Sequence, residues 1–329
     1  MNAKIRPAKD VIGVGNAIVD VLARADESLL DQLGLPKGVM TLVDGDQAEK
    51  IYESMKSTIA VSGGSVANTM VGLASLGGTG SYIGKVSNDE LGALFQNDLD
   101  SMGIYMHGYP VKGGPPTAKC LVIVTPDGQR SLATHLGACV NLDSRDIDFE
   151  AIKHHRITYL EGYLWDLPLA KEAMLQAAKH AHLADRSVAL TLSDSFCVSR
   201  HRASFQELIR SQVDILFANQ EEITSLYQVS DLESALGMVR DDCDLAAVTL
   251  GQNGSVIITK EKEYTIPAEP VGEVVDTTGA GDLYAAGFLF GVTHDYDLPT
   301  SGRFGSIAAA EIIGHMGARP EKKLSTLIY

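Results

Sequence analysis

The stretch Asp276-Thr277-Thr278-Gly279-Ala280-Gly281-Asp282 is the most informative part of this sequence. It runs directly into Leu283-Tyr284-Ala285-Ala286-Gly287-Phe288-Leu289, an apolar segment that predicts a helix. Small residues in front of a helix leave backbone N–H groups free, and the helix dipole adds positive potential there. The stretch therefore predicts an anion site, with the Asp282 carboxylate beside it in the first turn. A tight glycine turn with Asp282 as a capping residue is the alternative interpretation.

Upstream of this stretch, from residue 156 onward, strand and helix patterns alternate. Strands are predicted at 157–160, 187–192, 214–218 and 245–250, with helices such as 169–183 and 202–210 between them. Segments 255–259 and 263–266 predict a later hairpin. Strands joined by helical crossovers form a parallel sheet with helices on both faces, so the fold class is α/β.

The first half of the chain carries a second kind of pattern. Apolar runs predict strands at 11–15, 17–23, 40–43 and 81–86, and helical spacing predicts helices at 65–76 and 89–102. Residues 118–125 and 130–135 flank the turn signal Pro126-Asp127-Gly128-Gln129 and predict a hairpin. We expect one α/β domain over 1–329, with strands near 16–45 and 108–136 projecting as a small β lid.

Composition and charge exclude several classes of protein. Hydrophobic residues make up 45% and charged residues 21% of the 329 residues, which is typical of a globular chain with a sizeable core. The formal net charge of −15 argues against nucleic-acid or anionic-membrane partners, which need a basic face. Neither a signal-peptide pattern at residues 1–10 nor a long apolar run is present, and the cysteines form no CxxC pair. We expect a cytoplasmic protein with reduced cysteines.

Two common nucleotide-binding motifs fail in this sequence. Gly13-Val14-Gly15 follows a strand, but a dinucleotide fingerprint needs Gly or Ala at the position of Ile18. Gly84-Lys85 lacks the Ser or Thr that follows the lysine of a Walker A loop, and Thr79 stands where that motif has glycine. Nicotinamide and P-loop chemistry are therefore disfavoured.

The stretch at 276–282 resembles the second signature of the ribokinase-like (PfkB) family of carbohydrate and nucleoside kinases. The family's first signature is matched by Ser62-Gly63-Gly64-Ser65-Val66-Ala67-Asn68, followed by a helix to Leu76-Gly77-Gly78. The two signatures lie about 210 residues apart in the expected order, and the resemblance runs from about Val11 to Pro320. It implies a ribokinase-like parallel-sheet core with a β lid, and ATP-dependent phosphoryl transfer to a hydroxymethyl group.

The resemblance implies roles for the matched residues. Gly279, Ala280 and Gly281 would form the anion hole for the transferring phosphoryl group, and Asp282 would be the general base. Phosphoryl transfer depends mainly on positioning and charge stabilisation, so these groups form a sensible minimum. The sugar hydroxyls of the substrate would be held by Gly63, Gly64 and Asn68, with Asp20 opposite them; the other interpretation is a glycine pair at a helix start and an exposed aspartate.

On the nucleotide side, the resemblance implies sites for ATP and magnesium. Asn219-Gln220-Glu221-Glu222 matches an N-x-x-E element, in which Glu222 would act on Mg²⁺ through water. A simple helix cap is the alternative for Asn219 and Glu222. Thr249, Gly251 and Gly254 resemble the family's ATP-side strand and turn, or form an ordinary glycine turn. A monovalent cation such as K⁺ often binds behind the anion hole in this family, where Asp276 would contribute.

Three segments are similar to the adenosine-kinase branch of the family, namely 130–138, 191–196 and 214–219. Arg130 would contact the transferring phosphate from the lid, or merely solvate a strand edge. Phe196 would line the pocket for the base, together with Tyr163 and Leu136, or belong to the core. That branch often has proline before the phenylalanine, where this chain has Ser195.

These patterns predict a kinase that acts on a nucleoside, adenosine first. A kinase for a free sugar such as ribose or fructose is the alternative within the family. A catalytically silent nucleoside-binding sensor is a further class, and the intact Asp282 and Gly279-Ala280-Gly281 argue against it. The sequence leaves open whether the protein is a monomer or a homodimer.

Overall fold

A large, mostly parallel β-sheet forms the centre of the protein. The computed structural model describes residues 9–328. The sheet has nine strands in the order β14-β13-β12-β11-β10-β9-β1-β5-β6, parallel from β12 to β6, with β13 and β14 added antiparallel. Its strands are β1 (Lys9–Val14), β5 (Gly80–Ile83), β6 (Tyr105–His107), β9 (His155–Glu161), β10 (Ser187–Thr191), β11 (Ile215–Asn219), β12 (Leu245–Thr249), β13 (Ser255–Thr259) and β14 (Glu263–Ile266).

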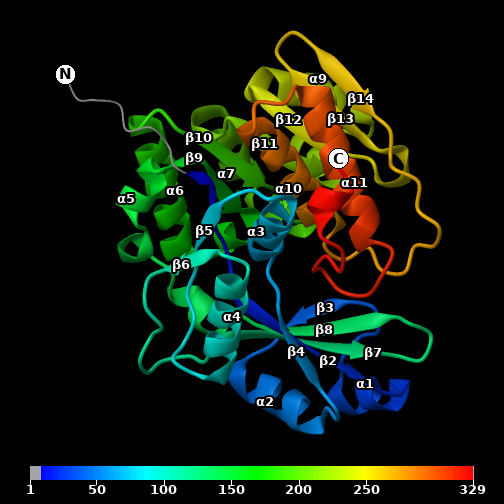
Figure 1. Cartoon of the computed structure of the whole chain (residues 1–329). Coiled ribbons are helices and arrows are strands. Elements are labelled where there is room, and N and C mark those ends of the chain that lie inside the picture. Colours follow the sequence, from blue (N-terminus) through cyan, green and yellow to red (C-terminus); the bar gives the residue numbers. More distant parts are fainter. Residues whose placement is uncertain (1–8, 329) are drawn as a thin grey trace.

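Helices cover both faces of this sheet because its strands are apolar on both sides (Figure 1). In β1, Val11 packs with α3 and α10, whereas Ile12 and Val14 pack with α6 on the other face. The helices are α3 (Ser65–Leu76), α10 (Ala280–Thr293) and α11 (Leu298–Ile312) on the first face, and α5 (Phe149–Lys153), α6 (Pro168–Leu183), α7 (Ser195–Gln212), α8 (Gln220–Tyr227) and α9 (Leu232–Asp242) on the second.

A second, smaller sheet stands apart from the first (Figure 1). It has five strands in the order β3-β8-β7-β2-β4. Its elements are β2 (Ile18–Arg24), β3 (Met40–Leu42), β4 (Ile59–Ser62), β7 (Ala118–Val124) and β8 (Arg130–His135), with α1 (Glu27–Leu33) and α2 (Gly45–Ser54) behind it and α4 (Glu90–Ser101) beside it. Val19 and Val21 point to the helix-covered face, so the alternate residues Asp20 and Leu22 point to the other face.

The α/β fold class, its parallel sheet and the hairpin at 118–135 agree with the sequence expectations, and helix α3 has the predicted bounds. Other elements differ or were not predicted, and two of them are instructive. β4 was not predicted, because its four residues acquire a strand partner only through pairing with β2. α7 begins at Ser195, seven residues before the predicted 202, since Asp194 caps it by accepting from the Cys197 N–H. Short 3₁₀ turns lie at Gly137–Asn141, Ser144–Asp146, Gly162–Asp166, Gly251–Asn253 and Leu324–Thr326.

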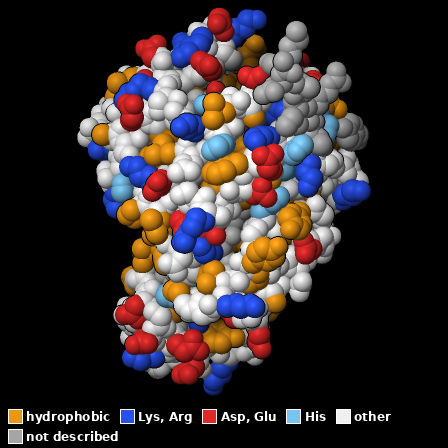
Figure 2. Space-filling view, turned by 90° about the vertical axis from the view of Figure 1, so that its left-hand side faces the viewer, with side chains coloured by type: hydrophobic (Ala, Val, Ile, Leu, Met, Phe, Trp, Pro, Cys, Tyr) orange, Lys and Arg blue, Asp and Glu red, His pale blue; other side chains and the backbone are white. Residues whose placement is uncertain are grey.

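Acidic and basic side chains are intermixed on the face of the molecule shown in Figure 2. Within residues 9–328, no helix is long and apolar enough to cross a membrane. The free cysteines Cys120, Cys139, Cys197 and Cys243 are all buried.

Candidate active site

The start of α10 lies at the edge of the main sheet and presents free backbone N–H groups. Gly279 precedes the helix with φ of 79°, a left-handed conformation that favours glycine. Ala280 donates its N–H to the Thr277 carbonyl at 3.2 Å. The N–H groups of Gly281 and Asp282 lie in the first turn, where a helix offers no acceptor, and no other acceptor in residues 9–328 takes them. The free N–H groups of this turn are thus those of Gly281 and Asp282, whereas the Ala280 N–H is occupied, and an anion site formed by Gly279, Ala280 and Gly281 stays a prediction.

The Asp282 carboxylate is held by the other signature. Ser65 donates its hydroxyl to Asp282 Oδ1 at 2.6 Å, and Asn68 donates its Nδ2 to Oδ2 at 2.9 Å. Burial raises the pKa of Asp282 to about 6, while the two hydrogen bonds and the charge of Arg319 oppose that rise. The two predicted signatures thus meet at one oriented carboxylate, which is ionised at neutral pH and able to accept a proton.

Asp20 approaches the same place from β2 in the second sheet. A Cβ on Gly63 would lie only 2.6 Å from Asp20 Oδ2, so only a glycine lets this carboxylate lie against the chain. Gly64 follows with φ of 92° and begins α3. Burial raises the pKa of Asp20 to about 6, and Asp282 is one of the charges that add to this rise. The structure therefore brings Asp20, Gly63, Gly64, Asn68 and Asp282 together, as the sequence predicted.

Arg130 links the second sheet to the loop before α10. Its guanidinium forms an ion pair with Asp276 Oδ2 at 2.7 Å and donates to Thr278 Oγ1 at 3.3 Å. Asp276 also accepts from the Thr278 N–H at 3.1 Å and from the Gly317 N–H at 2.9 Å. Arg130 is therefore no solvated strand edge but a contact between the second sheet and the loop before α10.

A cavity of about 370 Å³ opens on the other side of the α10 N-terminus. The predicted nucleotide residues Thr249, Gly251 and Gly254 line it. Ala280 and Gly281 line it too, together with Tyr284 of α10, Ser306 and Ala309 of α11 and Ile313 directly after α11. The cavity therefore adjoins the N-terminus of α10, one residue before Asp282.

Comparison with known proteins assigns the family. The model of the pfkB family carbohydrate kinases matches residues 44–324. The chain belongs to this family. A PfkB kinase transfers phosphate from ATP, usually with Mg²⁺, and the arrangement of acid, anion site and cavity agrees with that chemistry.

Several relatives of this PfkB kinase carry more specific names. The adenosine kinase of Saccharomyces cerevisiae is 27% identical over 338 residues, covering 96% of this chain and 98% of that protein. The crystal structure of adenosine kinase from Sinorhizobium meliloti is 47% identical with a TM-score of 0.91, covering 99% of this chain and 98% of that one. A probable sugar kinase from Rhizobium etli is 45% identical with a TM-score of 0.91, covering 98% of each chain.

Asn219 and Glu222 form a reciprocal helix cap in this PfkB kinase. Glu222 donates its N–H to Asn219 Oδ1 at 2.8 Å, and the Asn219 N–H donates to Glu222 Oε2 at 2.9 Å. The Glu222 residue is only 6% exposed, and burial raises its pKa to about 7. The capping interpretation is thus correct, and the role of Glu222 towards magnesium stays a prediction.

The aromatic wall expected for a base is less complete in this PfkB kinase. Phe196 is 73% exposed at the start of α7, so its assignment to the core is wrong. Tyr163 is partly buried and donates its hydroxyl to the Ser193 carbonyl at 3.4 Å. Leu136 precedes the 3₁₀ turn at Gly137. A pocket-wall role for these residues stays a prediction.

Sequence reasoning missed two buried charges of this kinase. Glu161 ends β9 and accepts from Asn16 Nδ2 at 2.6 Å and from the N–H groups of Asn16 and Val66 at 3.2 Å. Burial raises the pKa of Glu161 to about 7. Arg319 enters from the C-terminal segment and contacts the first signature. Neither residue belongs to a motif, and both gain their place only through tertiary packing.

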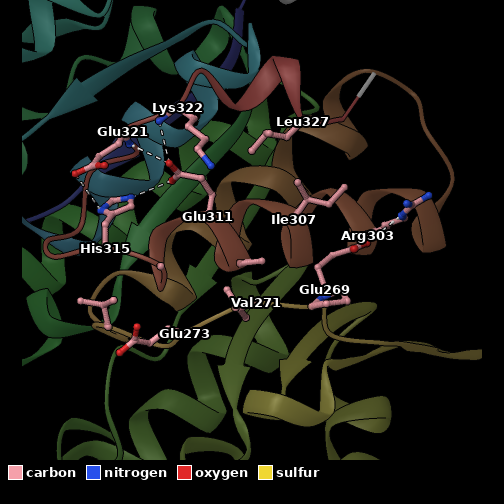
Figure 3. Close-up of a pocket in the computed structure, with 15 residues that line it drawn as sticks. Glu269, Val271, Glu273, Arg303, Ile307, Glu311, His315, Glu321, Lys322 and Leu327 are labelled. Carbon is pink, nitrogen blue, oxygen red and sulfur yellow. Dashed lines mark hydrogen bonds and ion pairs between the residues drawn. The ribbon is translucent and has the colours of Figure 1, made fainter.

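A larger hollow of about 600 Å³ lies beside α11 and is lined by residues of this helix and of the segments 269–275 and 321–327 (Figure 3). It shares Glu269, Val271 and Ala310 with the nucleotide cavity. At one end Glu311 Oε1 accepts from the N–H groups of Glu321 and Lys322 at 3.1 and 2.9 Å, and Glu311 Oε2 lies 3.3 Å from His315 Nε2 (Figure 3). Glu311 therefore ties the segment after Arg319 to α11.

Proposed function

We propose that this kinase transfers the γ-phosphoryl group of ATP to the 5′-hydroxyl of a nucleoside, with adenosine as the substrate. The observation that carries the proposal is the apolar surface of the second sheet around Asp20. A nucleoside differs from a free sugar by a flat apolar base, which needs such a wall next to the groups that hold its ribose.

Strand register determines which side chains share this surface. Asp20 pairs with Cys120 on β7 and with Val61 on β4, and Cys120 pairs with Thr134 on β8, so these side chains point the same way. Leu22 pairs with Val122, which pairs with Leu132, and Met40 on β3 pairs with Leu132 in turn. An apolar surface therefore adjoins the Asp20 carboxylate.

Part of this surface is open to solvent. Met40 is 46% exposed and Leu42 is 58% exposed, both on β3. Such apolar side chains on the same face as Asp20 gain free energy when a ligand covers them, about 25 cal/mol for each Å² buried. A free sugar, which carries hydroxyls on every side, would leave this gain unused.

The chemistry follows from the groups at the α10 N-terminus. Asp282 would take the proton of the 5′-hydroxyl, and the N–H groups of Gly281 and Asp282 would hold the transferring phosphoryl oxygens. Arg130 would leave its ion pair with Asp276 and contact the transferring phosphoryl group instead, which adds positive charge there. The cavity lined by Thr249, Gly251 and Gly254 would hold the nucleotide. Mg²⁺ would neutralise charge on the nucleotide phosphates, with Glu222 holding its water ligands.

The comparisons support both a nucleoside and a sugar. Adenosine kinases recur among the relatives, including the 47% identical protein of Sinorhizobium meliloti. A probable sugar kinase is 45% identical, so a free sugar is the second candidate acceptor. A monovalent cation near Asp276 would fit either reaction.

Leu42→Ser tests the apolar wall. Leu42 is 58% exposed, so its replacement spares the core but removes apolar contact with a base. We expect the KM for adenosine to rise by about three- to tenfold, with the activity on ribose unchanged. Leu183→Ser is the matched control, since Leu183 is 73% exposed at the end of α6. An unchanged KM in steady-state assays of Leu42→Ser would oppose the nucleoside assignment.

A further inference from the structure

The side chain of Arg319 reaches the first signature from the far end of the chain. Its Nε donates to the Ser62 carbonyl at 3.1 Å, its Nη1 to the Ala67 carbonyl at 2.9 Å and its Nη2 to Ser62 Oγ at 2.8 Å. All of these acceptors are neutral. The guanidinium therefore uses its hydrogen bonds for position, and no carboxylate within residues 9–328 forms an ion pair with it.

A positive charge such as that of Arg319 is unusual at the N-terminus of a helix. Ala67 lies in the first turn of α3, where the helix dipole is positive and favours acidic groups. A guanidinium there is unfavourable unless nearby carboxylates compensate for it. Asp20 lies against Gly63 and Asp282 is bonded to Ser65 and Asn68, so both carboxylates border the same short segment.

The segment that carries Arg319 is fixed at several points. Glu311 holds the N–H groups of Glu321 and Lys322 (Figure 3). Ser75 on α3 accepts from the Leu324 N–H at 2.9 Å. The guanidinium is therefore held in place by α3 and α11 together, as an electrostatic role requires.

We propose that Arg319 is a positioning residue for phosphoryl transfer, whose guanidinium supplies the positive charge that keeps the Asp282 and Asp20 carboxylates ionised in the closed site. The proposal rests on the proposed function, since it takes Asp282 as the base. Arg319 contacts neither reacting group directly and acts through the field at the two carboxylates.

The charges around Asp282 make this role necessary. The titratable and charged groups that interact with Asp282 are Asp20 on β2, Tyr159 and Glu161 on β9, Tyr163 after β9, Glu222 on α8 and Arg319, while Arg130 on β8 acts on Asp20. Acidic groups dominate this set, and each ionised one disfavours the charged form of Asp282. The cation that lowers the pKa of Asp282 is Arg319, and Asp20 is stabilised by both Arg319 and Arg130.

Asp98 on α4 carries a negative charge next to Arg319, so its removal should have the opposite effect from the removal of Arg319. Its carboxylate accepts from the Ser62 hydroxyl, which in turn accepts from Arg319, and its charge favours the protonated guanidinium. Removing the negative charge of Asp98 leaves the positive potential of Arg319 at Asp282 less compensated. Two variants should therefore move the same titration in opposite directions.

The test is the pH profile of kcat/KM in Arg319→Met, Arg319→Lys and Asp98→Asn, with melting temperatures alongside. In Arg319→Met we expect the acid limb to move up by about one pH unit, which from a parent limb near pH 6 means about threefold loss at pH 6.5 and nearly complete recovery at pH 8. Arg319→Lys should stay near the parent. In Asp98→Asn the acid limb should move down.

Arg156→Gln is the matched control. Arg156 also donates to a backbone carbonyl, that of Thr293, but it lies at the start of β9, whereas Glu161 at the end of this strand is near the site. Its profile should match the parent. A uniform loss at every pH in Arg319→Met, with an unmoved acid limb in Asp98→Asn, would show a merely structural role. If Arg319→Met does not fold, Asp98→Asn decides alone. If the parent phosphorylates only a sugar, the nucleoside assignment fails but the same shifts can be read with that sugar.

Discussion

Asp282 has the three properties that a general base in this reaction needs. It is oriented by hydrogen bonds from Ser65 and Asn68, it lies beside free backbone N–H groups, and its pKa of about 6 leaves it ionised yet basic at neutral pH. Motif reasoning predicted the residue itself. The orienting bonds depend on α3 and α10 packing together, which only the structure reveals.

Asp282→Asn should separate binding from chemistry. The amide keeps the shape of the side chain but cannot accept the proton, so turnover should fall by about 100-fold or more while adenosine affinity stays near the parent value. Calorimetry and initial-rate assays would measure both. Asp100→Asn, an exposed carboxyl on α4, is the control. Near-parent turnover in a folded Asp282→Asn protein would remove Asp282 from the role of base.

Four enclosed carboxyls should make stability depend on pH. Burial raises the pKa of Asp20 and Asp282 to about 6 and that of Glu161 and Glu222 to about 7. The folded state therefore binds more protons than the unfolded state between about pH 4 and pH 7, so these groups lower stability as pH rises through that window.

Glu161→Gln should flatten that dependence, since it removes one of the raised titrations. Melting temperatures of the ligand-free protein between pH 5 and pH 8 would measure the effect. Glu150→Gln, whose side chain is 73% exposed, is the control and should keep the parent's slope. A parent melting temperature that rises steadily from pH 5 to pH 8 would contradict the account of these carboxyls.

At the scale of elements, the sequence predicted what local periodicity encodes. The strand-like runs of β7 and β8 on either side of a turn signal and the apolar helix α3 were visible as patterns. β4 was not, because four residues carry too little pattern and its place depends on pairing with β2. The positions of Arg319 and Glu161 also escaped prediction, since Arg319 meets Ser62 across 257 residues of chain.

Arg130 connects the small sheet to the loop before α10. Arg130→Met should remove the ion pair with Asp276 and the positive charge for the transferring phosphate. We expect kcat/KM to fall by about tenfold or more, as for other lost charge-stabilising donors. Arg24→Met is the matched control, because Arg24 lies on the same face, two strands away across Val124. Equal kinetics in both variants would leave Arg130 as a structural link alone.

At the scale of the whole molecule, the small sheet and the large sheet divide the task. In the proposed reaction, the N-terminus of α10 beside the large sheet would supply Asp282, the anion site and the nucleotide cavity, and the small sheet would supply Asp20, Arg130 and an apolar wall. This division explains why composition and motifs predict a kinase but leave the acceptor open. The acceptor depends on the surface formed by strands that are distant in sequence.

A competition between acceptors tests the central claim most directly. The purified protein, with ATP and Mg²⁺, would be offered adenosine, ribose and fructose together, and the products would be identified and their rates measured. The account predicts that adenosine is converted to its 5′-monophosphate with a higher kcat/KM than either sugar. A higher kcat/KM for ribose or fructose would contradict it and leave only the family assignment standing.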